Sequence, residues 1–339
     1  KQGSLTKNRG KKTMNPAIFV TRKLPHAAMA LLEENFQMEC NPHDRVLLRE
    51  ELLDAVAGKE GILSLLTDTM DGEVMDSAGN NLKIIANYAV GFNNIDVGAA
   101  TKRKIAVSNT PGVLTDTTAD LAMALILAVA RRIVESDIYT RAEKYMGWDP
   151  LLFMGSDVHH KTLGILGFGR VGQALAKRAA GFDMKILYHD MFRVDPEIEK
   201  KVGATYVDQN TLLKTSDYIS IHVPLTPETT GLIDSDTLSL MKPSAFVINT
   251  ARGEIIREAD LVKALTEKKI AGAGLDVFEN EPKIHPGLLK MNNVVILPHI
   301  GSASMETRTK MGLIAASNLI AKFKGEIPPN CLNPEIFES

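Results

Sequence analysis

The segment Lys161–Gly172 constrains the fold of this chain more than any other part of its sequence. It opens with apolar residues 163–166, typical of a buried strand, and leads through Gly167, Gly169 and Gly172, in the pattern G-x-G-x-x-G, into a helical segment. In such a turn the first glycine makes the bend, the second lets a pyrophosphate approach the backbone, and the third lets the helix pack close to the strand. The phosphates would lie at the helix N-terminus, where free N–H groups and the helix dipole favour anions.

The residues that follow support a dinucleotide site over a purely structural glycine turn, which is the alternative. A second apolar strand, residues 184–189, ends at Asp190, 18 residues past Gly172. An acidic residue at about this spacing typically holds a ribose 2′-hydroxyl. The strand, the glycine turn, the helix and the acidic residue therefore predict together that a dinucleotide binds here.

Composition and charge fit an ordinary globular protein of two domains. The chain has 339 residues, 45% hydrophobic and 24% charged, with a net charge of −2. Residues 1–13 carry five positive charges and no acid, which leaves −7 for residues 14–339. A mildly acidic body argues against nucleic acid as the main partner. We expect residues 1–13 to be a tag or a disordered tail, and Met14 to be the native start.

The cysteines and the apolar runs exclude several other classes of protein. Cys40 and Cys331 provide neither a disulfide framework nor the spacing of a metal site. The longest apolar run, Leu121–Ala130, is ten residues long, which is too short to span a bilayer. No secretory signal is visible, so the sequence predicts a cytoplasmic protein that does not bind a membrane or a metal.

Strands and helices alternate along nearly the whole chain, which predicts an α/β fold of two doubly wound parallel-sheet domains. We expect crossings between the domains near Thr110–Pro111 and Leu297–Pro298. These crossings divide the chain into a discontinuous substrate-binding domain, residues 14–110 and 298–339, and an inserted dinucleotide-binding domain, residues 111–297. The expected strands are residues 17–21, 61–66, 82–87, 105–108, 163–167, 185–190, 204–207, 218–222, 245–249, 274–277 and 294–297, and helices are expected at 27–35 and 304–324.

A long helix follows the first crossing. Thr115 or Asp116 is expected to cap it, and residues 119–132 are apolar nearly all round, which requires burial. That burial is either between the domains or against a second subunit. Residues 142–160 then form a long irregular stretch that includes Trp148, and loops of this length usually have a function or pack on something. We therefore expect this stretch to form an arm onto a partner subunit, and the protein to be a homodimer.

Several motifs in fixed order carry a resemblance to a known family. They are Asn87–Asp96, the glycine motif with Asp190, His222–Thr229, Asn249–Gly253, Gly274–Pro282 and Leu297–Gly301. With these motifs the chain resembles the D-isomer-specific 2-hydroxyacid dehydrogenases over residues 14–335, and within them it is most similar to glyoxylate/hydroxypyruvate reductases. The resemblance implies a Rossmann domain that binds NAD, inserted in a flavodoxin-like substrate domain.

The resemblance implies that Arg252, Glu281 and His299 are catalytic. Reduction of a 2-keto acid needs a hydride at the carbonyl carbon and a proton at its oxygen, and an imidazolium can supply that proton. Glu281 would orient the ring and favour its charged form, and Arg252 would bind the substrate carboxylate and polarise the keto group. Taken singly, each residue fits an ordinary loop or surface position just as well.

Val90 and Gly91 fall where the family holds the substrate carboxylate with backbone N–H groups. A glycine suits a close approach, and the alternative is an ordinary turn after a strand. Because Gly91 and Arg252 belong to different domains, the active site is expected between them, with closure at the two crossings.

The family's cofactor contacts fall on the glycine loop and on the segments that follow later strands: Thr118, Gly167, Phe168, Gly169, Arg170, Val171, Gly172, Asp190, His222, Val223, Pro224, Thr229, Thr250, Ala251, Asp276 and Gly301. Among these, Asp276 is expected near the nicotinamide amide, with Thr250 and Ala251 near its ribose. His222 and Pro224 are expected beside the adenosine half.

Asp190 predicts NADH as the preferred cofactor, because its charge accepts from ribose hydroxyls and repels a 2′-phosphate. Many glyoxylate reductases of this type carry a small residue followed by a basic one there, and use NADPH. Here Met191 follows Asp190, and Arg193 three residues on keeps NADPH possible.

Other functions share this scaffold. Phosphoglycerate and D-lactate dehydrogenases are the nearest enzymatic alternatives, and a non-catalytic NAD-sensing scaffold like the corepressors is a different class. The sequence does not determine which 2-keto acid is the physiological substrate.

Overall fold

The computed structural model describes residues 15–338, so the expected tail, residues 1–13, lies outside the described residues. The chain forms two compact units. The first unit runs to Val113 and resumes at Ser304, and the second comprises Leu114–Ala303. These boundaries lie three and six residues beyond the crossings expected from the sequence. Among residues 15–338, no helix combines the length and the apolar character needed to cross a membrane.

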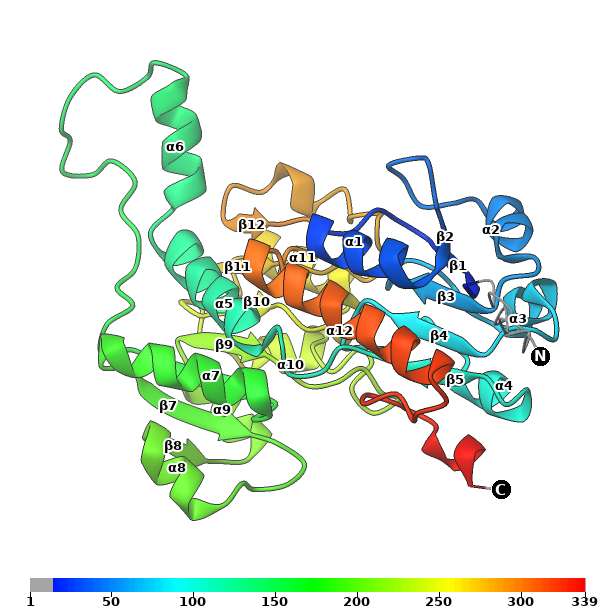
Figure 1. Ribbon diagram of the computed structural model, residues 1–339. Coiled ribbons are helices and arrows are strands. Elements are labelled where there is room, and N and C mark those ends of the chain that lie inside the picture. Colours follow the sequence, from blue (N-terminus) through cyan, green and yellow to red (C-terminus); the bar gives the residue numbers. More distant parts are fainter. Residues whose placement is uncertain (1–14, 339) are drawn as a thin grey trace, which may run out of the picture. The chain divides into compact units, whose positions relative to one another are not determined.

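The first unit is built on a five-stranded, all-parallel sheet (Figure 1). Its strands lie in the order β2-β1-β3-β4-β5, with bounds β1 Ala17–Val20, β2 Gln37–Cys40, β3 Gly61–Ser64, β4 Ile84–Asn87 and β5 Ala106–Ser108. The edge strand β2 is not among the strands expected from the sequence. Its residues Gln37 and Glu39 are exposed, so it lacks the continuous apolar run that marks a strand buried on both faces.

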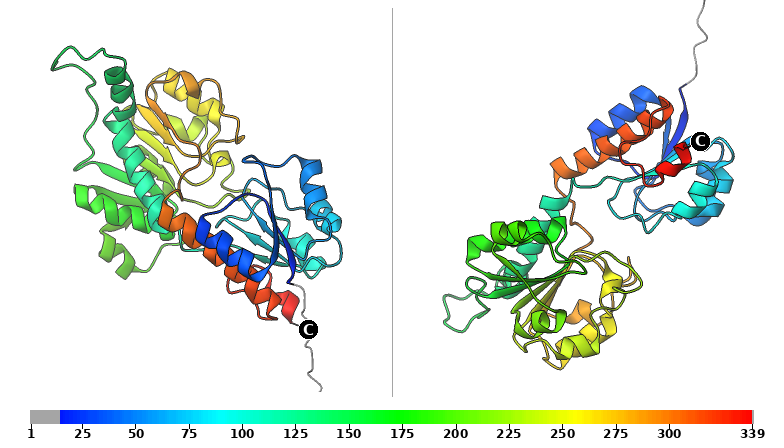
Figure 2. Two further views of the ribbon diagram at one scale, coloured as in Figure 1. Left: turned by 45° about the horizontal axis from the view of Figure 1, so that its top comes forward. Right: turned by 90° about the horizontal axis from the view of Figure 1, so that it is seen from below.

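Alternate residues of these strands pack on opposite layers of helices. Ile18 and Val20 belong to the core beneath α1 and α12, whereas Phe19 belongs to the core on the other face. Two helices cover the first face, α1 His26–Asn35 and α12 Met305–Phe323, and three cover the second, α2 Arg49–Val56, α3 Gly72–Ala78 and α4 Val97–Lys102 (Figures 1 and 2). Because successive side chains of a strand point to opposite faces of the sheet, each strand contributes to both of these cores.

The second unit contains a seven-stranded parallel sheet. Its order is β12-β11-β10-β9-β6-β7-β8, with bounds β6 Thr162–Leu166, β7 Lys185–His189, β8 Ala204–Tyr206, β9 Tyr218–Ile221, β10 Phe246–Asn249, β11 Gly272–Leu275 and β12 Val294–Ile296. The order reverses between β6 and β9. Open parallel sheets bind ligands outside the carboxyl ends of the strands at this reversal, which is where the glycine motif begins.

Helices cover both faces of this sheet as well (Figure 2). One core gathers side chains from α5 Thr115–Ala130, α7 Arg170–Ala179 and α8 Pro196–Val202, and the other from α9 Gln209–Thr215, α10 Ser235–Ser239 and α11 Glu258–Thr266. Short 3-10 turns complete the chain: η1 Ala180–Phe182, η2 Gly253–Ile255, η3 Leu288–Lys290 and η4 Pro334–Phe337.

The long apolar helix α5 differs from the expectation in two respects. It begins at Thr115 after Leu114, and no side chain caps it, so the expected cap at Thr115 or Asp116 is wrong. It also ends at Ala130, and Arg132 at a φ of +54° separates it from the next helix. Its buried residues pack in a core of its own unit, so that face does not need a second subunit, one of the two kinds of cover expected from the sequence. Leu121, Leu127 and Ala128 are half-buried, and Ala124 is exposed.

The next helix, α6 Ile133–Arg141, and the irregular residues 142–157 project from the rest of the second unit (Figure 1). We call these two segments the arm. Within the arm, Phe153 packs against α6. Its ring lies edge-to-face to that of Tyr139, with centroids 5.1 Å apart, and the guanidinium of Arg132 lies over it at 5.0 Å. No residue of α6 is buried, so the arm carries exposed apolar side chains that α5 does not.

Candidate active site

The three glycines of the motif occupy three different environments. Gly167 has a φ of +91°, and a Cβ on it would collide with the backbone of His222 and Val223. A Cβ on Gly172 would collide with the carbonyl oxygen of Gly167, whereas nothing lies within 4 Å of the Cβ position of Gly169. These are the turn, the close helix–strand packing and the open approach that a pyrophosphate site requires.

Polar groups around this loop lack protein partners. Helix α7 starts at Arg170 with Gly169 as its N-cap and no side-chain cap, so its first backbone N–H groups, those of Arg170 and Val171, are available to an anion. The Oγ1 of Thr250 is buried without a hydrogen-bond partner among the described residues. A buried hydroxyl of this kind is expected to have a partner, so both features fit a bound polar cofactor.

Asp190 directly follows β7 and contacts the glycine loop. Its Oδ2 accepts a hydrogen bond from the N–H of Phe168 at 2.6 Å, and the Phe168 ring stacks on Tyr188 with centroids 4.0 Å apart. The loop and the carboxylate are thus fixed relative to each other before any ligand binds. The second carboxylate oxygen keeps its capacity to accept from ribose hydroxyls.

His222 and the segment after it border the same loop. Burial lowers the pKa of His222 to about 4, and its Nε2 lies 2.8 Å from the Oγ of Ser220. The ring is therefore neutral at pH 7 and adds no positive charge to the site. Thr229 donates to the carbonyl oxygen of Pro224 at 2.6 Å, which holds the turn of this segment.

Arg252 lies just beyond β10 in a turn that Asn249 holds. The side chain of Asn249 donates to the carbonyl oxygen of Arg252 at 2.8 Å and accepts from the N–H of Ala251 at 3.0 Å. The guanidinium donates to the Ala251 carbonyl at 2.7 Å. Burial lowers the pKa of Arg252 from its usual value, although it remains a cation. The remaining N–H donors of the guanidinium suit a planar carboxylate.

Glu281 and His299 are hydrogen-bonded, with Oε2 of the carboxylate 2.9 Å from Nδ1 of the ring. The other carboxylate oxygen accepts from the N–H of Phe278 at 3.1 Å. Burial on its own would raise the pKa of Glu281, but the hydrogen bond and charge of His299, with that of Arg252, bring it below its usual value. With Nδ1 engaged, Nε2 of the ring is the nitrogen that can exchange a proton with a ligand.

His299 adopts a left-handed backbone conformation, with a φ of +53°. Such a residue costs of order 1–3 kcal/mol and persists only where its surroundings hold it. Asp276 does so, because its two oxygens accept from the N–H groups of Ile300 and Gly301, each at 2.7 Å. Thr118 adds a hydrogen bond to the Gly301 carbonyl at 3.1 Å. Asp276, Thr118 and Gly301 therefore hold the histidine loop, a role that the sequence analysis did not assign.

In the first unit, residues 89–91 form a backbone arrangement that exposes three donors. The carbonyl oxygens of Ala89, Val90 and Gly91 accept from Thr110 N at 2.9 Å, Asn109 Nδ2 at 2.7 Å and Asn87 Nδ2 at 2.9 Å respectively. In a trans peptide the N–H points opposite to the carbonyl, so the N–H groups of residues 90–92 face the other way. None of these three has an acceptor among residues 15–338. We call these three successive N–H groups the residue 90–92 nest, because successive unpartnered backbone N–H groups are typical of an anion site.

The nest includes one donor that the sequence analysis missed, the N–H of Phe92. It also gives roles to Asn87 and Asn109, buried side chains that the sequence alone does not distinguish from other turn asparagines. The third loop asparagine with such a role is Asn249, at Arg252. A usable signal was present, since each of the three follows or ends a buried strand.

Residues 15–338 contain no group of three or more His, Cys, Asp or Glu side chains that could hold a metal ion.

The chain matches the family model described as D-isomer specific 2-hydroxyacid dehydrogenase, NAD binding domain, over residues 123–301. A glyoxylate reductase from Thermococcus litoralis is 52% identical over 330 residues, covering 96% of this chain and 99% of the relative. The crystal structure of the TT0316 protein from Thermus thermophilus is similar with a TM-score of 0.87 and 43% identity, covering 93% of this chain and 99% of that one.

A further solved structure is an NADPH-dependent glyoxylate/hydroxypyruvate reductase from Sinorhizobium meliloti in complex with NADP and malonate. It is similar with a TM-score of 0.81 and 32% identity, covering 94% of this chain and 97% of that one. The second unit therefore binds NAD(H) or NADP(H), in agreement with the glycine motif.

The glycine environments predict two opposite outcomes for the same substitution. Gly169→Ala should leave the unfolding midpoint unchanged, because its Cβ meets open space, but should weaken NADH binding by about tenfold or more, because it occupies the pyrophosphate approach. Gly172→Ala should destabilise the protein by about 1–3 kcal/mol, because its Cβ meets the Gly167 carbonyl. Urea unfolding and fluorescence titration with NADH measure both. Equal effects of the two variants on stability would contradict this assignment.

Proposed function

We propose that this chain, which belongs to the D-isomer-specific 2-hydroxyacid dehydrogenase family, reduces a small 2-keto acid, either glyoxylate to achiral glycolate or hydroxypyruvate to D-glycerate, with NADH preferred over NADPH. The reduction of glyoxylate-type keto acids with NAD(P)H follows from its relatives. The observation that carries the finer proposal is the Glu281–His299 pair, set in the same unit as Arg252 and the glycine loop.

His299 is the proposed general acid. When bound, the reduced nicotinamide supplies the hydride that reduces the carbonyl carbon. The Nε2–H of His299 gives its proton to the carbonyl oxygen, while Nδ1 stays bound to Glu281. Glu281 fixes the orientation of the ring and favours its protonated form, and its lowered pKa keeps it charged at neutral pH. In the oxidative direction the same nitrogen accepts the proton.

Two groups are proposed to bind the substrate carboxylate. Arg252 offers paired N–H donors and, at the carbonyl oxygen, a positive charge that stabilises the developing negative charge. The residue 90–92 nest offers neutral donors that need no reorganisation, since Asn87, Asn109 and Thr110 already hold its carbonyls. This supports the roles expected for Val90 and Gly91 and adds Phe92.

The preference for NADH rests on Asp190. Its free carboxylate oxygen can accept from a ribose hydroxyl, and its charge repels a 2′-phosphate. The roles proposed for Thr250 and Ala251 at the nicotinamide ribose rest on the unpartnered Thr250 hydroxyl.

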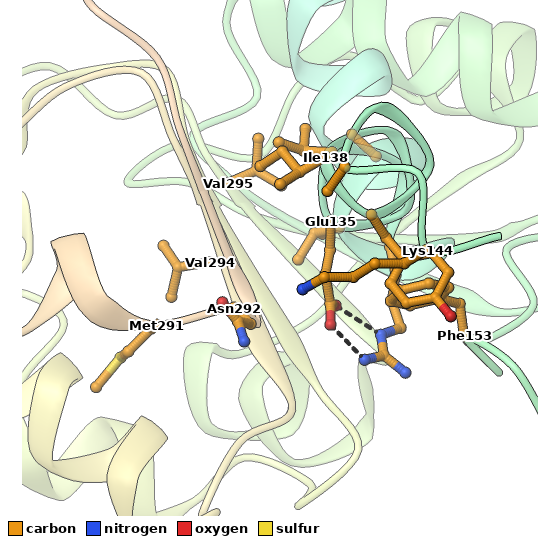
Figure 3. A pocket seen from close by; sticks show the side chains of 14 residues that line it. Glu135, Ile138, Lys144, Phe153, Met291, Asn292, Val294 and Val295 are labelled. Atoms are coloured by element: carbon orange, nitrogen blue, oxygen red, sulfur yellow. Dashed lines mark hydrogen bonds and ion pairs between the residues drawn. The ribbon is translucent and has the colours of Figure 1, made fainter.

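The arm supports a homodimer joined through the second units. Met146 and Trp148 are 93% and 84% exposed, and α6 adds exposed Ile133 and Ile138. Beside them is a cavity of about 300 Å³ between α5, the arm and β12, lined by Ile138, Phe153 and Val295 among others (Figure 3). Several large exposed apolar side chains on one segment are typical of an interface. The large exposed apolar side chains thus lie on the arm, and not on α5.

Replacement of the proposed acid tests the chemistry. The protein should reduce hydroxypyruvate to D-glycerate, and His299→Ala should lower kcat by about 10²–10⁴-fold, the usual contribution of a general acid. Coupled spectrophotometric assays and chiral chromatography of the product measure these effects. His43→Ala, at an exposed histidine of the first unit, is the matched control and should keep full activity. Formation of L-glycerate, or near-normal turnover by His299→Ala, would refute the assignment.

Loss of the Glu281 charge should change the pH dependence of reduction. Because the lowered pKa of Glu281 keeps it ionised through neutral pH, its charge favours the protonated ring over the whole working range. Glu281→Gln should therefore move the alkaline decline of kcat/KM to lower pH by about one unit or more. Glu254→Gln, which removes a nearby charge without a bond to His299, should leave the profile in place. Identical profiles for wild type and Glu281→Gln would exclude this role.

Light scattering tests the dimer. At micromolar concentration the protein should have twice the 37.0 kDa mass of one chain. Trp148→Glu combined with Ile138→Glu should shift it to the mass of one chain, because charges on the arm would be desolvated in the interface. Ile327→Glu, an equally drastic change at an exposed residue of the first unit, should leave the dimer intact. A wild-type mass near 37.0 kDa would refute the proposal.

A further inference from the structure

Arg193 is the cation next to Asp190 in sequence, yet its guanidinium is already engaged. Its Nε donates to Oε1 of Glu199 and its Nη2 to Oε2, each at 2.8 Å. Glu199 projects from α8, and only 11% of its side chain is exposed, compared with 59% for Arg193. This two-point pairing leaves Arg193 at the surface and neutralised by an acid with little access to water.

Glu199 is also held by Tyr188, which lies in strand β7 of the same unit. Tyr188 donates its hydroxyl proton to Oε1 of Glu199 at 2.7 Å and accepts from the N–H of Val194 at 3.2 Å. Tyr188 is fully buried and stacks on Phe168 of the glycine loop. The hydrogen bonds from Arg193 and Tyr188 lower the pKa of Glu199 to about 2, so the pair stays charged at every working pH.

The position of Arg193 makes this pairing relevant to cofactor choice. Arg193 lies three positions after Asp190, a span of about 11 Å at most along the backbone, and a long side chain adds to that reach. An arginine near the acidic residue of a dinucleotide site can accommodate a 2′-phosphate. A phosphate that recruited Arg193 here would have to displace a bidentate carboxylate, the geometry that arginine binds best.

From these contacts we infer that Glu199 is a selectivity residue for the dinucleotide: it holds Arg193 away from a 2′-phosphate and thereby reinforces the preference for NADH. It acts through Arg193 and is a positioning residue. Asp190 repels the phosphate directly, and Glu199 withholds the cation that would compensate for that repulsion. The inference rests on the proposed function, because it concerns the cofactor selectivity of that same site.

The experiment measures dissociation constants of NAD⁺ and NADP⁺ by calorimetry, which does not depend on turnover. Glu199→Gln keeps the size of the side chain and removes its charge. It should tighten NADP⁺ binding by about tenfold, the usual scale of a charge-assisted hydrogen bond, and leave NAD⁺ binding within about twofold. Arg193→Met added to Glu199→Gln should abolish that gain. Glu197→Gln, an exposed acid of the same helix, controls for the loss of one negative charge and should change neither constant.

Arg193→Met alone decides the case even if Glu199→Gln does not fold. With Glu199 present, Arg193 is withheld, so its loss should leave NADP⁺ affinity unchanged. A single Arg193→Met variant that weakens NADP⁺ binding would overturn the inference, as would an unchanged ratio of the two constants in folded Glu199→Gln. Failure of the wild type to bind either dinucleotide would instead refute the proposed cofactor site. A wild type that prefers NADP⁺ would refute the role of Asp190, while the comparison of variants still tests Glu199.

Discussion

The hydrogen bonds from Ile300 and Gly301 to Asp276 hold the loop on which the proposed chemistry depends. A histidine at positive φ is unfavourable by itself, and two charge-assisted bonds of 2.7 Å offset that cost. Burial raises the pKa of Asp276, and the same two N–H groups counter that effect. The buried carboxylate of Asp276 thus links the end of β11 to the loop after β12.

The same principle recurs at three other strand ends, those of β4, β5 and β10. Backbone beyond a sheet has lost its ladder partners, and buried carbonyl and N–H groups need others. Asn87 and Asn109 satisfy carbonyls in the residue 90–92 nest, and Asn249 satisfies both kinds of group around Arg252. The short asparagine side chains donate to the carbonyl oxygens of these loops. The N–H groups of the residue 90–92 nest and the N–H donors of Arg252 therefore stay available to a ligand. The anion-binding capacity of these loops is thus a consequence of how their backbone is satisfied.

Charge is distributed in the second unit by fixed pairs. Glu281 is matched to His299 and Glu199 to Arg193, whereas His222 is kept neutral by burial. Arg252 and Asp190 lack an ion-pair partner in the described part of the chain, and these are the charges proposed for the substrate carboxylate and the ribose. The lack of an ion-pair partner supports these two proposed roles, because an unpaired, partly buried charge is costly unless a ligand of opposite charge or a hydrogen-bond partner compensates it.

The sequence by itself determined the alternation of strands and helices, the three glycine environments and the position of Asp190, because these depend on local periodicity and on backbone sterics within a few residues. It also placed Arg252 just past a strand end. It could not predict that α5 is covered by its own unit, that Asp276 and Thr118 hold the histidine loop, or that Asn109 completes the nest at Val90. Those contacts join residues 24, 183 and 19 positions apart. Only the tertiary structure brings such pairs together, since no local pattern records which buried polar group a distant loop will need.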